Sequence, residues 1–284
     1  MDVSISHASH AIYRGMDRTA LDAAYNNSAA VGDSPQWLAR WSERSAVRRA
    51  GPNVRLDIPY AGRERTSLDY FGSGEAGAPL LVFLHGGYWQ RNSKEMFSFV
   101  ADGPNVRGID VAVVGYTLAP AARLSDIVAE VDQALEYLAG HADQFGFDRG
   151  SIVVGGWSAG GHLASVAATR PEVRGALCVS GIFDLDPIAL CYLNDLLQLD
   201  RGEVELLSPI RRAQLGTAPQ SLVVGGDELP ELRRQSADYA DVGRRVGLRV
   251  RQRTLPGHHH FSILDELASA NGALTAELVT LARR

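Results

Sequence analysis

Residues 151–164 read Ser-Ile-Val-Val-Gly-Gly-Trp-Ser-Ala-Gly-Gly-His-Leu-Ala, and they predict a strand, a tight turn and a helix in direct succession. Residues 152–154 are apolar and β-branched, which is typical of a buried parallel strand. The helix is expected over residues 159–169, because Pro171 prevents it from continuing. Ser158 lies at the turn between the two elements.

The turn fits the pattern Gly-x-Ser-x-Gly at residues 156–160. In a nucleophile elbow, this pattern lifts a serine above the sheet in a strained backbone conformation. Its neighbours two positions away must be small, so that strand and helix can pass closely. The helix N-terminus would favour negative charge at Ser158. Glycines after a strand also form ordinary turns, so the motif alone leaves both interpretations open.

The composition of the 284-residue chain, with 45% apolar and 21% charged residues, is typical of a soluble globular enzyme with a substantial core. We expect one domain over residues 1–284, with an N-terminal helical segment at 1–50 and a small cap insertion at 182–207. The net charge of −5 argues against nucleic acid or an anionic membrane as a partner.

The two cysteines and the N-terminus bear on the cellular compartment. Cys178 and Cys191 are too few for a disulfide framework in a chain of this length, so reduced thiols are expected. Residues 1–18 lack a basic-then-apolar signal pattern. No apolar run approaches the roughly 20 residues of a membrane span. These features predict a cytoplasmic protein.

Strands that alternate with helices predict an α/β fold with a mainly parallel sheet and helices on both faces. An antiparallel hairpin is expected at one edge of this sheet. The expected strands are 54–58, 66–71, 80–84, 109–114, 152–154, 175–180, 222–225 and 248–255. The expected helices are 17–25, 34–46, 93–100, 124–145, 159–169, 231–246 and 267–283.

Polar residues predict where several of these helices begin. Asp17 can cap the first helix, Ser34-Pro35 is a strong helix start, and Ser125 can cap the long helix 124–145. The N-terminal helices are expected to pack on the domain and to cover the site in part.

A second motif, His85-Gly-Gly-Tyr-Trp89, directly follows the expected strand 80–84. Such a turn can aim backbone N–H groups into the space above the sheet. The N–H groups of Gly87 and Tyr88, together with that of Ala159, are therefore expected to form an oxyanion hole. A plain turn beside a core histidine is the alternative, and His85 itself is interpreted as structural.

A serine at an elbow needs a histidine base and an acid, which follow the serine in loops after later strands. The loop at 226–231 offers Asp227 and Glu228. The loop at 256–262 offers three consecutive histidines, of which one is expected to be the base. Adjacent loop histidines rarely all reach one ion, so no metal site is expected. His162 is a less suitable base, because its side chain projects along its own helix.

These motifs resemble the α/β-hydrolase superfamily and, within it, the kynurenine formamidase (arylformamidase) family. The resemblance is carried by four stretches: His85-Gly-Gly-Tyr-Trp89, Gly156-Trp-Ser-Ala-Gly160, Glu228-Leu-Pro-Glu-Leu-Arg-Arg-Gln-Ser236 and His260-Phe-Ser-Ile263. The loose similarity extends from about residue 21 to residue 267. Leu232 departs from the family, which often has phenylalanine there, and this departure bears on the substrate.

The resemblance implies an α/β-hydrolase fold and a triad of Ser158, Glu228 and His260. It favours Glu228 because the family's acid stands two positions before a Pro-Glu pair, and Asp227 stays open as the rival. It also implies that His260, beside Phe261, is the base.

The activity implied is hydrolysis of an aryl formamide or amide, with a substrate like N-formylkynurenine, through an acyl-enzyme. No cofactor is required. A carboxylesterase acting on small esters is the alternative, and a non-catalytic ligand-binding homologue is an alternative of another class. The expected partner is a small amide or ester with an aromatic group, and a homodimer is left open.

The predicted pocket is small on the acyl side and aromatic on the other. Its expected substrate-binding residues are Trp89, Trp157, Tyr192 and Phe261. Tyr88 and Phe183 are further candidates for its walls, and Tyr192 lies in the 182–207 insertion.

Overall fold

A computed structural model of the protein describes residues 10–215 and 218–283. Its centre is one eight-stranded sheet in the order β1-β2-β4-β3-β5-β6-β7-β8. The strands are β1 (Val54–Pro59), β2 (Ser67–Phe71), β3 (Ala78–Leu84), β4 (Asp110–Val114), β5 (Phe147–Trp157), β6 (Val173–Val179), β7 (Gln220–Gly225) and β8 (Val250–Leu255).

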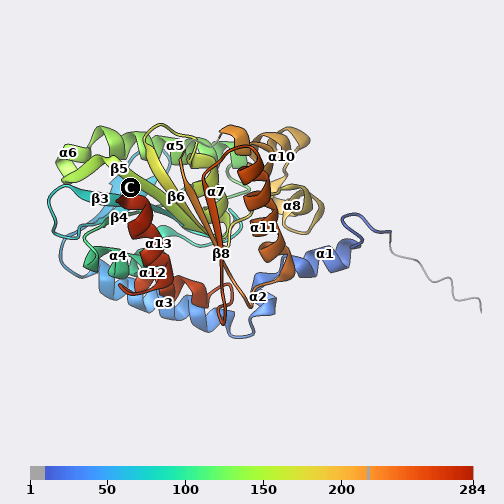
Figure 1. Cartoon of the computed structure of the whole chain (residues 1–284). Helices are drawn as coiled ribbons and strands as arrows, with labels where there is room; N and C mark the ends of the chain where they lie inside the picture. Colours follow the sequence, from blue (N-terminus) through green and yellow to red (C-terminus); the bar gives the residue numbers. More distant parts are fainter. Residues whose placement is uncertain (1–9, 216–217, 284) are drawn as a thin grey trace, which may run out of the picture.

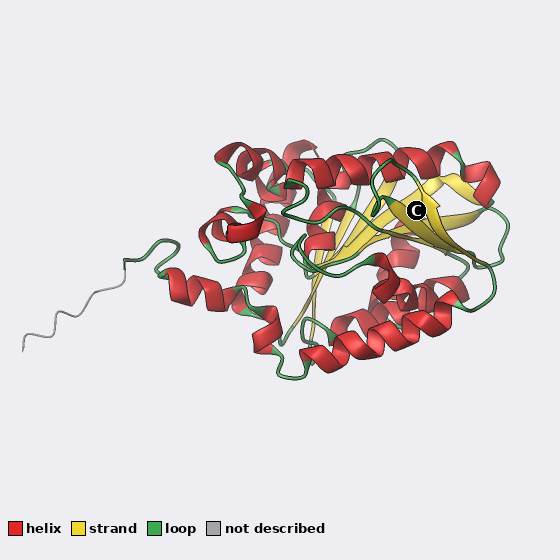
Figure 2. Ribbon diagram, turned by 180° about the vertical axis from the view of Figure 1, so that it is seen from behind, coloured by secondary structure: helices red, strands yellow, loops and turns green. Residues whose placement is uncertain are grey.

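Only the β1 edge of the sheet departs from parallel pairing. β1 pairs antiparallel with β2, and β2 pairs antiparallel with β4, whereas the pairs from β4 to β8 are parallel. The predicted mainly parallel sheet with a hairpin at its edge is therefore confirmed. Figure 2 shows the twisted sheet between layers of helices.

Helices cover both faces because the strands are apolar on both sides. Leu80, Val82 and Leu84 of β3 pack in one apolar cluster, and Leu81 and Phe83 pack in the other. The helices are α1 (Arg18–Ala24), α2 (Asn27–Ala30), α3 (Ser34–Arg49), η1 (Lys94–Ala101), α4 (Asp102–Val106), α5 (Leu124–Gly140), α6 (Ala142–Phe145), α7 (Ala159–Ala167), α8 (Asp186–Leu190), α9 (Asn194–Leu197), α10 (Arg201–Leu207), η2 (Pro209–Arg211), η3 (Ala213–Leu215), α11 (Pro230–Arg245), η4 (Ser262–Leu264), α12 (Asp265–Ala268) and α13 (Ala273–Ala282).

The two apolar clusters define two helical layers. The first cluster joins the sheet to α5, α7 and α11, and the second joins it to α3, η1, α12 and α13. Figure 1 shows α5 and α6 on one side of the sheet and α3, α4, α12 and α13 on the other. No helix in residues 10–215 and 218–283 is long and apolar enough to cross a membrane.

Several helix boundaries differ from the sequence-based expectations. The expected helix 124–145 ends at Gly140, and α6 is separate. The N-cap of α5 is Arg123, whose backbone N–H donates to the side chain of Asp126. Ser125 is therefore not the cap, because its N–H and hydroxyl both donate to Glu203 of α10.

Three further segments also depart from the expected helices. Residues 94–101 form a 3₁₀ helix, and the expected helix 267–283 is split into α12 and α13. The 182–207 segment contains three short helices, α8, α9 and α10. At the N-terminus, the predicted cap is confirmed, because the Asp17 side chain accepts a hydrogen bond from the Ala20 N–H at 2.8 Å.

Candidate active site

The predicted turn after β5 has the geometry of a strained elbow. β5 ends at Trp157, α7 begins at Ala159, and Ser158 between them has φ 58° and ψ −118°. This conformation is unfavourable for a residue with a side chain and costs about 1–3 kcal/mol. The Ser158 N–H donates to the Val179 carbonyl at 2.8 Å, which anchors the turn to β6.

The two glycines of the motif are required by close backbone packing. A Cβ atom at Gly160 would lie 1.9 Å from the Leu84 carbonyl oxygen, and one at Gly156 would lie 2.3 Å from the Gly160 carbonyl oxygen. No side chain fits at either position. The spacing of Gly-x-Ser-x-Gly thus follows from the contact between α7 and the ends of β3 and β5.

A buried histidine–carboxylate pair follows the last two strands. The His260 Nδ1 lies 2.7 Å from Glu228 Oε2, and both residues are buried. Glu228 Oε1 also accepts hydrogen bonds from the Ser180 hydroxyl at 2.5 Å and from the Gly225 N–H at 2.7 Å. Both carboxylate oxygens are therefore held in place, and His260 Nδ1 carries the proton toward them. This leaves His260 Nε2 as the acceptor.

The rival acid points elsewhere. Asp227 is exposed, and its backbone N–H donates to the His258 carbonyl. Of the two neighbouring carboxylates that the sequence left open, the structure brings Glu228 alone to His260.

The turn after β3 and the start of α7 together present free backbone donors. Gly87, Tyr88 and Trp89 have φ values of 121°, 53° and 58°. The Gly87 carbonyl accepts from the N–H of Arg91 at 3.0 Å, which closes the turn. Among the described residues, no hydrogen bond uses the N–H of Gly87, of Tyr88 or of Ala159. These are the donors that an oxyanion hole needs.

His85 lies behind this turn and is fully buried. Its ring stacks on Tyr116 with a centroid distance of 4.3 Å, and its Nδ1 lies 2.9 Å from the Gly86 carbonyl oxygen. Burial lowers the pKa of His85 to about 4. The ring is thus neutral and packed, in keeping with a structural role.

One cavity brings the predicted residues together. Ser158, His260, Gly87 and Tyr88 all line it, and its empty volume, open mouth included, is about 490 Å³. Its aromatic walls include three of the predicted substrate-binding residues, namely Trp157, Tyr192 and Phe261.

Two of the candidate wall residues lie outside this cavity. Trp89 is completely buried and packs edge-on against His162 at a centroid distance of 5.0 Å. Phe183 stacks on Tyr239 in the core. Trp89 therefore lies outside the cavity in this structure, and its contact with substrate stays a prediction.

Part of the cavity lining was not predicted from the sequence. Asn26, Asn27, Ser28 and Leu38 come from the N-terminal helices, and Arg91 and Asn92 follow the oxyanion turn. The only sequence signal was the polar run at 26–28, where the first helix stops.

The N-terminal segment is tied to the site by hydrogen bonds. The Tyr88 hydroxyl donates to the Tyr25 carbonyl at 2.6 Å, and Asn27 Nδ2 donates to the Tyr88 hydroxyl at 2.8 Å. The Tyr25 hydroxyl donates to Glu231 at 3.0 Å and accepts from Gln235 at 2.7 Å. The expected partial cover of the site therefore involves α1, α2 and the start of α11.

The other histidines have separate partners. His162 is buried, and its Nε2 lies 2.8 Å from the Leu207 carbonyl oxygen. His258 faces Glu266 at 3.5 Å, and the ring of His259 packs edge-on against Trp37 at 5.2 Å. The rings of residues 258–260 thus diverge and do not converge on one point.

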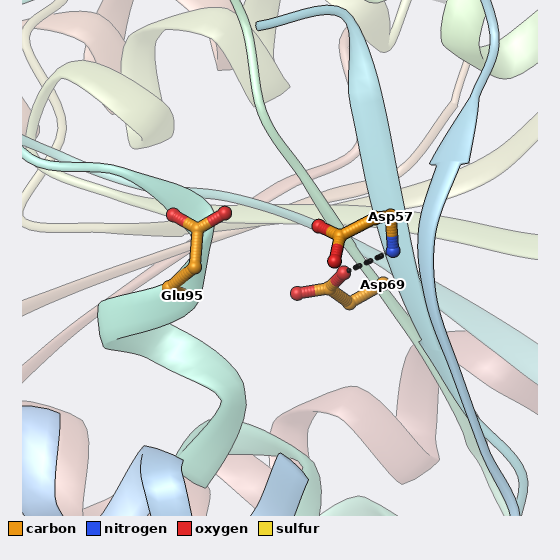
Figure 3. A group of neighbouring side chains, drawn as sticks. All are labelled: Asp57, Asp69 and Glu95. Atoms are coloured by element: carbon orange, nitrogen blue, oxygen red, sulfur yellow. Dashed lines mark hydrogen bonds between the residues drawn. The ribbon is translucent and has the colours of Figure 1, made fainter.

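Three carboxylates, from β1, β2 and η1, lie close enough together to resemble a metal site. Figure 3 shows Asp57, Asp69 and Glu95. However, the ammonium group of Lys94 lies 2.5, 2.7 and 2.9 Å from their oxygens. Arg49 also pairs with Asp69. This cluster already contains its cations and joins α3 and η1 to the sheet.

Comparisons with known proteins identify related hydrolases. The family model described as BD-FAE matches residues 70–183. A kynurenine formamidase from Danio rerio is 29% identical, over 95% of this chain and 98% of its own length. A kynurenine formamidase from Salmo salar is 31% identical, over 80% of this chain and 81% of its own length. The carboxylic ester hydrolase LipN from Mycobacterium tuberculosis is 28% identical over 82% of this chain and 72% of its own length.

Solved structures share the fold. A candidate thioesterase from Silicibacter sp. superposes with a TM-score of 0.83 and 28% identity, covering 91% of this chain and 98% of that one. The carboxylesterase EstE1, from a metagenomic library, gives a TM-score of 0.74 at 20% identity, covering 88% and 98% of the two chains. The eight-stranded sheet described above is therefore an α/β-hydrolase fold.

Proposed function

Since the chain belongs to the kynurenine formamidase family of α/β-hydrolases, we propose that it hydrolyses the formamide bond of an N-formylated aryl amine such as N-formylkynurenine. The observation that carries this proposal is the cavity lined by Ser158 and His260, in which Glu228 holds the histidine at 2.7 Å and free backbone N–H groups line the turn. This arrangement supports Ser158 as the nucleophile, His260 as the base, Glu228 as the acid and backbone N–H groups as the oxyanion donors.

The proposed reaction has two halves. Ser158 Oγ attacks the formyl carbonyl while His260 Nε2 takes its proton. The N–H groups of Gly87, Tyr88 and Ala159 stabilise the oxyanion. The C–N bond then breaks, and His260 gives the proton to the departing aryl amine. Water, deprotonated by the same histidine, attacks the formyl-serine and releases formate and free Ser158.

The walls of the cavity support an aromatic leaving group. Trp157 and Phe261 lie beside His260, with ring centroids at 4.7 and 5.7 Å. Tyr192, from the segment before α9, lines the cavity with them. Flat apolar walls next to the base suit the aryl amine that the base protonates.

A carboxylesterase is the second candidate, because the same residues would cleave an ester and because LipN and EstE1 are named as ester hydrolases. A non-catalytic binding role is disfavoured, since such homologues usually lose one member of the triad.

The test compares N-formyl-L-kynurenine with a short-chain aryl ester, in the wild type and in Ser158→Ala. We expect release of kynurenine that falls by about 10³-fold or more in the variant. Ester turnover without release of kynurenine would contradict the formamidase proposal and favour the esterase. Failure to cleave either substrate would contradict both.

A further inference from the structure

Asn27 carries a buried hydrogen-bond acceptor with no partner. The residue is 4% exposed and lines the same cavity as Ser158. Its Oδ1 is buried and accepts no hydrogen bond within the described part of the chain. Leaving a buried polar atom unsatisfied costs about 1–3 kcal/mol, so such an atom on a residue that lines a cavity points to a ligand that supplies a donor.

The hydrogen bonds of Tyr88 determine which end of the Asn27 amide is free. The Tyr88 hydroxyl has one proton, and it donates this proton to the Tyr25 carbonyl oxygen at 2.6 Å. The contact between Asn27 and the Tyr88 hydroxyl at 2.8 Å must then use the amide NH₂ of Asn27 as donor. The free atom is therefore the carbonyl oxygen, which can only accept.

Arg91, which lines the same cavity, offers a positive charge and hydrogen-bond donors. It is the arginine among the lining residues, and it is exposed. No carboxylate pairs with it in residues 10–215 and 218–283. Its guanidinium lies near the Tyr192 hydroxyl and lowers the pKa of that group, against the larger rise that burial causes. An unpaired guanidinium beside a cavity suits a carboxylate, which it can bind through two hydrogen bonds.

We propose that Arg91 and Asn27 form a specificity subsite for an α-amino acid group on the substrate, in which Arg91 binds the carboxylate and Asn27 Oδ1 accepts from the amine. A neutral acceptor beside a single cation disfavours a phosphate, which offers no N–H. This inference rests on the proposed function, since it takes this cavity as the substrate site. Both are specificity-determining residues and take no part in bond breaking.

The experiment measures binding and requires no turnover. Calorimetry compares three ligands: L-kynurenine, its analogue without the α-amine (ortho-aminobenzoyl-propanoate) and ortho-aminoacetophenone, which lacks both charged groups. In the wild type, L-kynurenine should bind about tenfold or more tightly than the ketone. Arg91→Gln should weaken binding of both carboxylates about tenfold. Arg245→Gln, an equal charge change at an exposed arginine at the end of α11, should not.

The role of Asn27 is tested by the ratio of the affinities for L-kynurenine and for its analogue without the amine. General damage to the site should weaken both affinities and leave this ratio unchanged. Asn27→Leu should bring the affinities of L-kynurenine and its analogue without the amine to within about twofold, because only the amine needs Oδ1. An unchanged ratio would refute the role of Asn27. Equal binding of L-kynurenine to Arg91→Gln and Arg245→Gln would refute that of Arg91.

Failure of the subsite differs from failure of the proposed function. If the wild type releases kynurenine but Arg91→Gln keeps its affinity for it, the formamidase proposal stands and the subsite is wrong. If the wild type cleaves only esters but shows the binding pattern, the subsite stands and the reaction is wrong.

Discussion

The position of Glu228 distinguishes the two candidates for the acid beside His260, which are Glu228 and Asp227. Its two carboxylate oxygens reach His260, Ser180 and the Gly225 N–H. Asp227, one residue earlier, is exposed. The sequence could not decide between them without the family resemblance, since a one-residue change in a loop exchanges the inward and outward positions. A hydrogen bond from Ser180, which directly follows β6 and is distant in sequence, helps to hold the inner carboxylate.

We predict that Glu228→Ala lowers kcat by about 10²- to 10⁴-fold, because His260 loses the partner that orients it and stabilises its charged form. Asp227→Ala should stay within a few fold of the wild type. Steady-state hydrolysis of an aryl ester measures both. A dead Asp227→Ala beside an active Glu228→Ala would reverse the assignment.

Gly160 tests the packing behind the elbow. A Cβ atom there would meet the Leu84 carbonyl oxygen at 1.9 Å. Gly160→Ala should therefore lower the free energy of unfolding by at least about 1–3 kcal/mol and displace Ser158. Gly140→Ala is the matched control, since a Cβ there meets no atom within 4 Å at the end of α5. It should be neutral or stabilising by up to about 1 kcal/mol. Chemical denaturation compares them, and equal losses would contradict the steric explanation.

At the scale of elements, the strands were more predictable than the helix boundaries. Residues 80–84 and 109–114 are continuous apolar runs, and both lie in central strands. The break between α5 and α6 at His141 directly follows Gly140, but a single glycine in a helical pattern is tolerated and does not by itself predict a helix end. The 3₁₀ geometry of η1 left no local signal in the sequence either. Its first residue, Lys94, forms ion pairs with Asp57 of β1 and Asp69 of β2, which are distant in sequence.

The N-terminal segment is the element whose role was least visible in the sequence. Its amphipathic pattern predicts packing, but not which residues reach the cavity. Asn26 and Asn27 line the cavity, and tertiary hydrogen bonds hold this segment there. The Tyr25 hydroxyl joins it to Glu231 and Gln235 of α11, and the Tyr88 hydroxyl bonds to Tyr25 and Asn27. The contact between Tyr25 and Glu231 spans some two hundred residues and depends on tertiary structure.

We predict that Tyr25→Phe loosens α1 from α11. The variant keeps the ring and removes a buried hydroxyl with two partners, at a cost of about 1–3 kcal/mol. Amides in Arg18–Ala24 should then exchange about 5- to 100-fold faster. Tyr137→Phe is the control, since its hydroxyl has no hydrogen bond in the described part of the chain. Hydrogen exchange is measured by mass spectrometry. Equal exchange rates of the α1 amides in the two variants would refute the role of the Tyr25 hydroxyl in holding α1 on α11.

At the scale of the whole molecule, the fold class follows from the order of strands and helices. The sheet order and the placement of the elbow, the acid and the histidine after β5, β7 and β8 agree with the superfamily pattern. The organisation of residues 1–284 as one domain stays a prediction. The sequence could not predict whether a side chain such as that of Trp89 packs in the core or lines the cavity, because this depends on the tertiary structure around it.

Two buried histidines make the stability of the whole molecule depend on pH. Burial lowers the pKa of His85 and of His162 from 6.5 to about 4. Between these values the unfolded chain binds more protons than the fold. Stability is therefore full above about pH 6.5 and falls as the pH drops toward about 4. Each histidine accounts for a loss on the order of 3 kcal/mol in the free energy of unfolding as the pH falls across this window.

We predict that His162→Gln flattens this dependence. Unfolding free energies measured across the same pH window should show a smaller acid loss than in the wild type, because one of the two titrating groups is gone. An identical acid loss in the variant would mean that His162 does not titrate differently in the fold.

Ser158 is proposed as the nucleophile of a formamide hydrolysis. The most direct measurement is labelling with a fluorophosphonate, followed by peptide mass mapping and by assay of N-formyl-L-kynurenine hydrolysis on the same samples. We predict one label per chain, on Ser158, with activity lost in proportion to labelling and no label on Ser158→Ala. Full labelling of Ser158 with undiminished release of kynurenine would show that Ser158 is not the nucleophile.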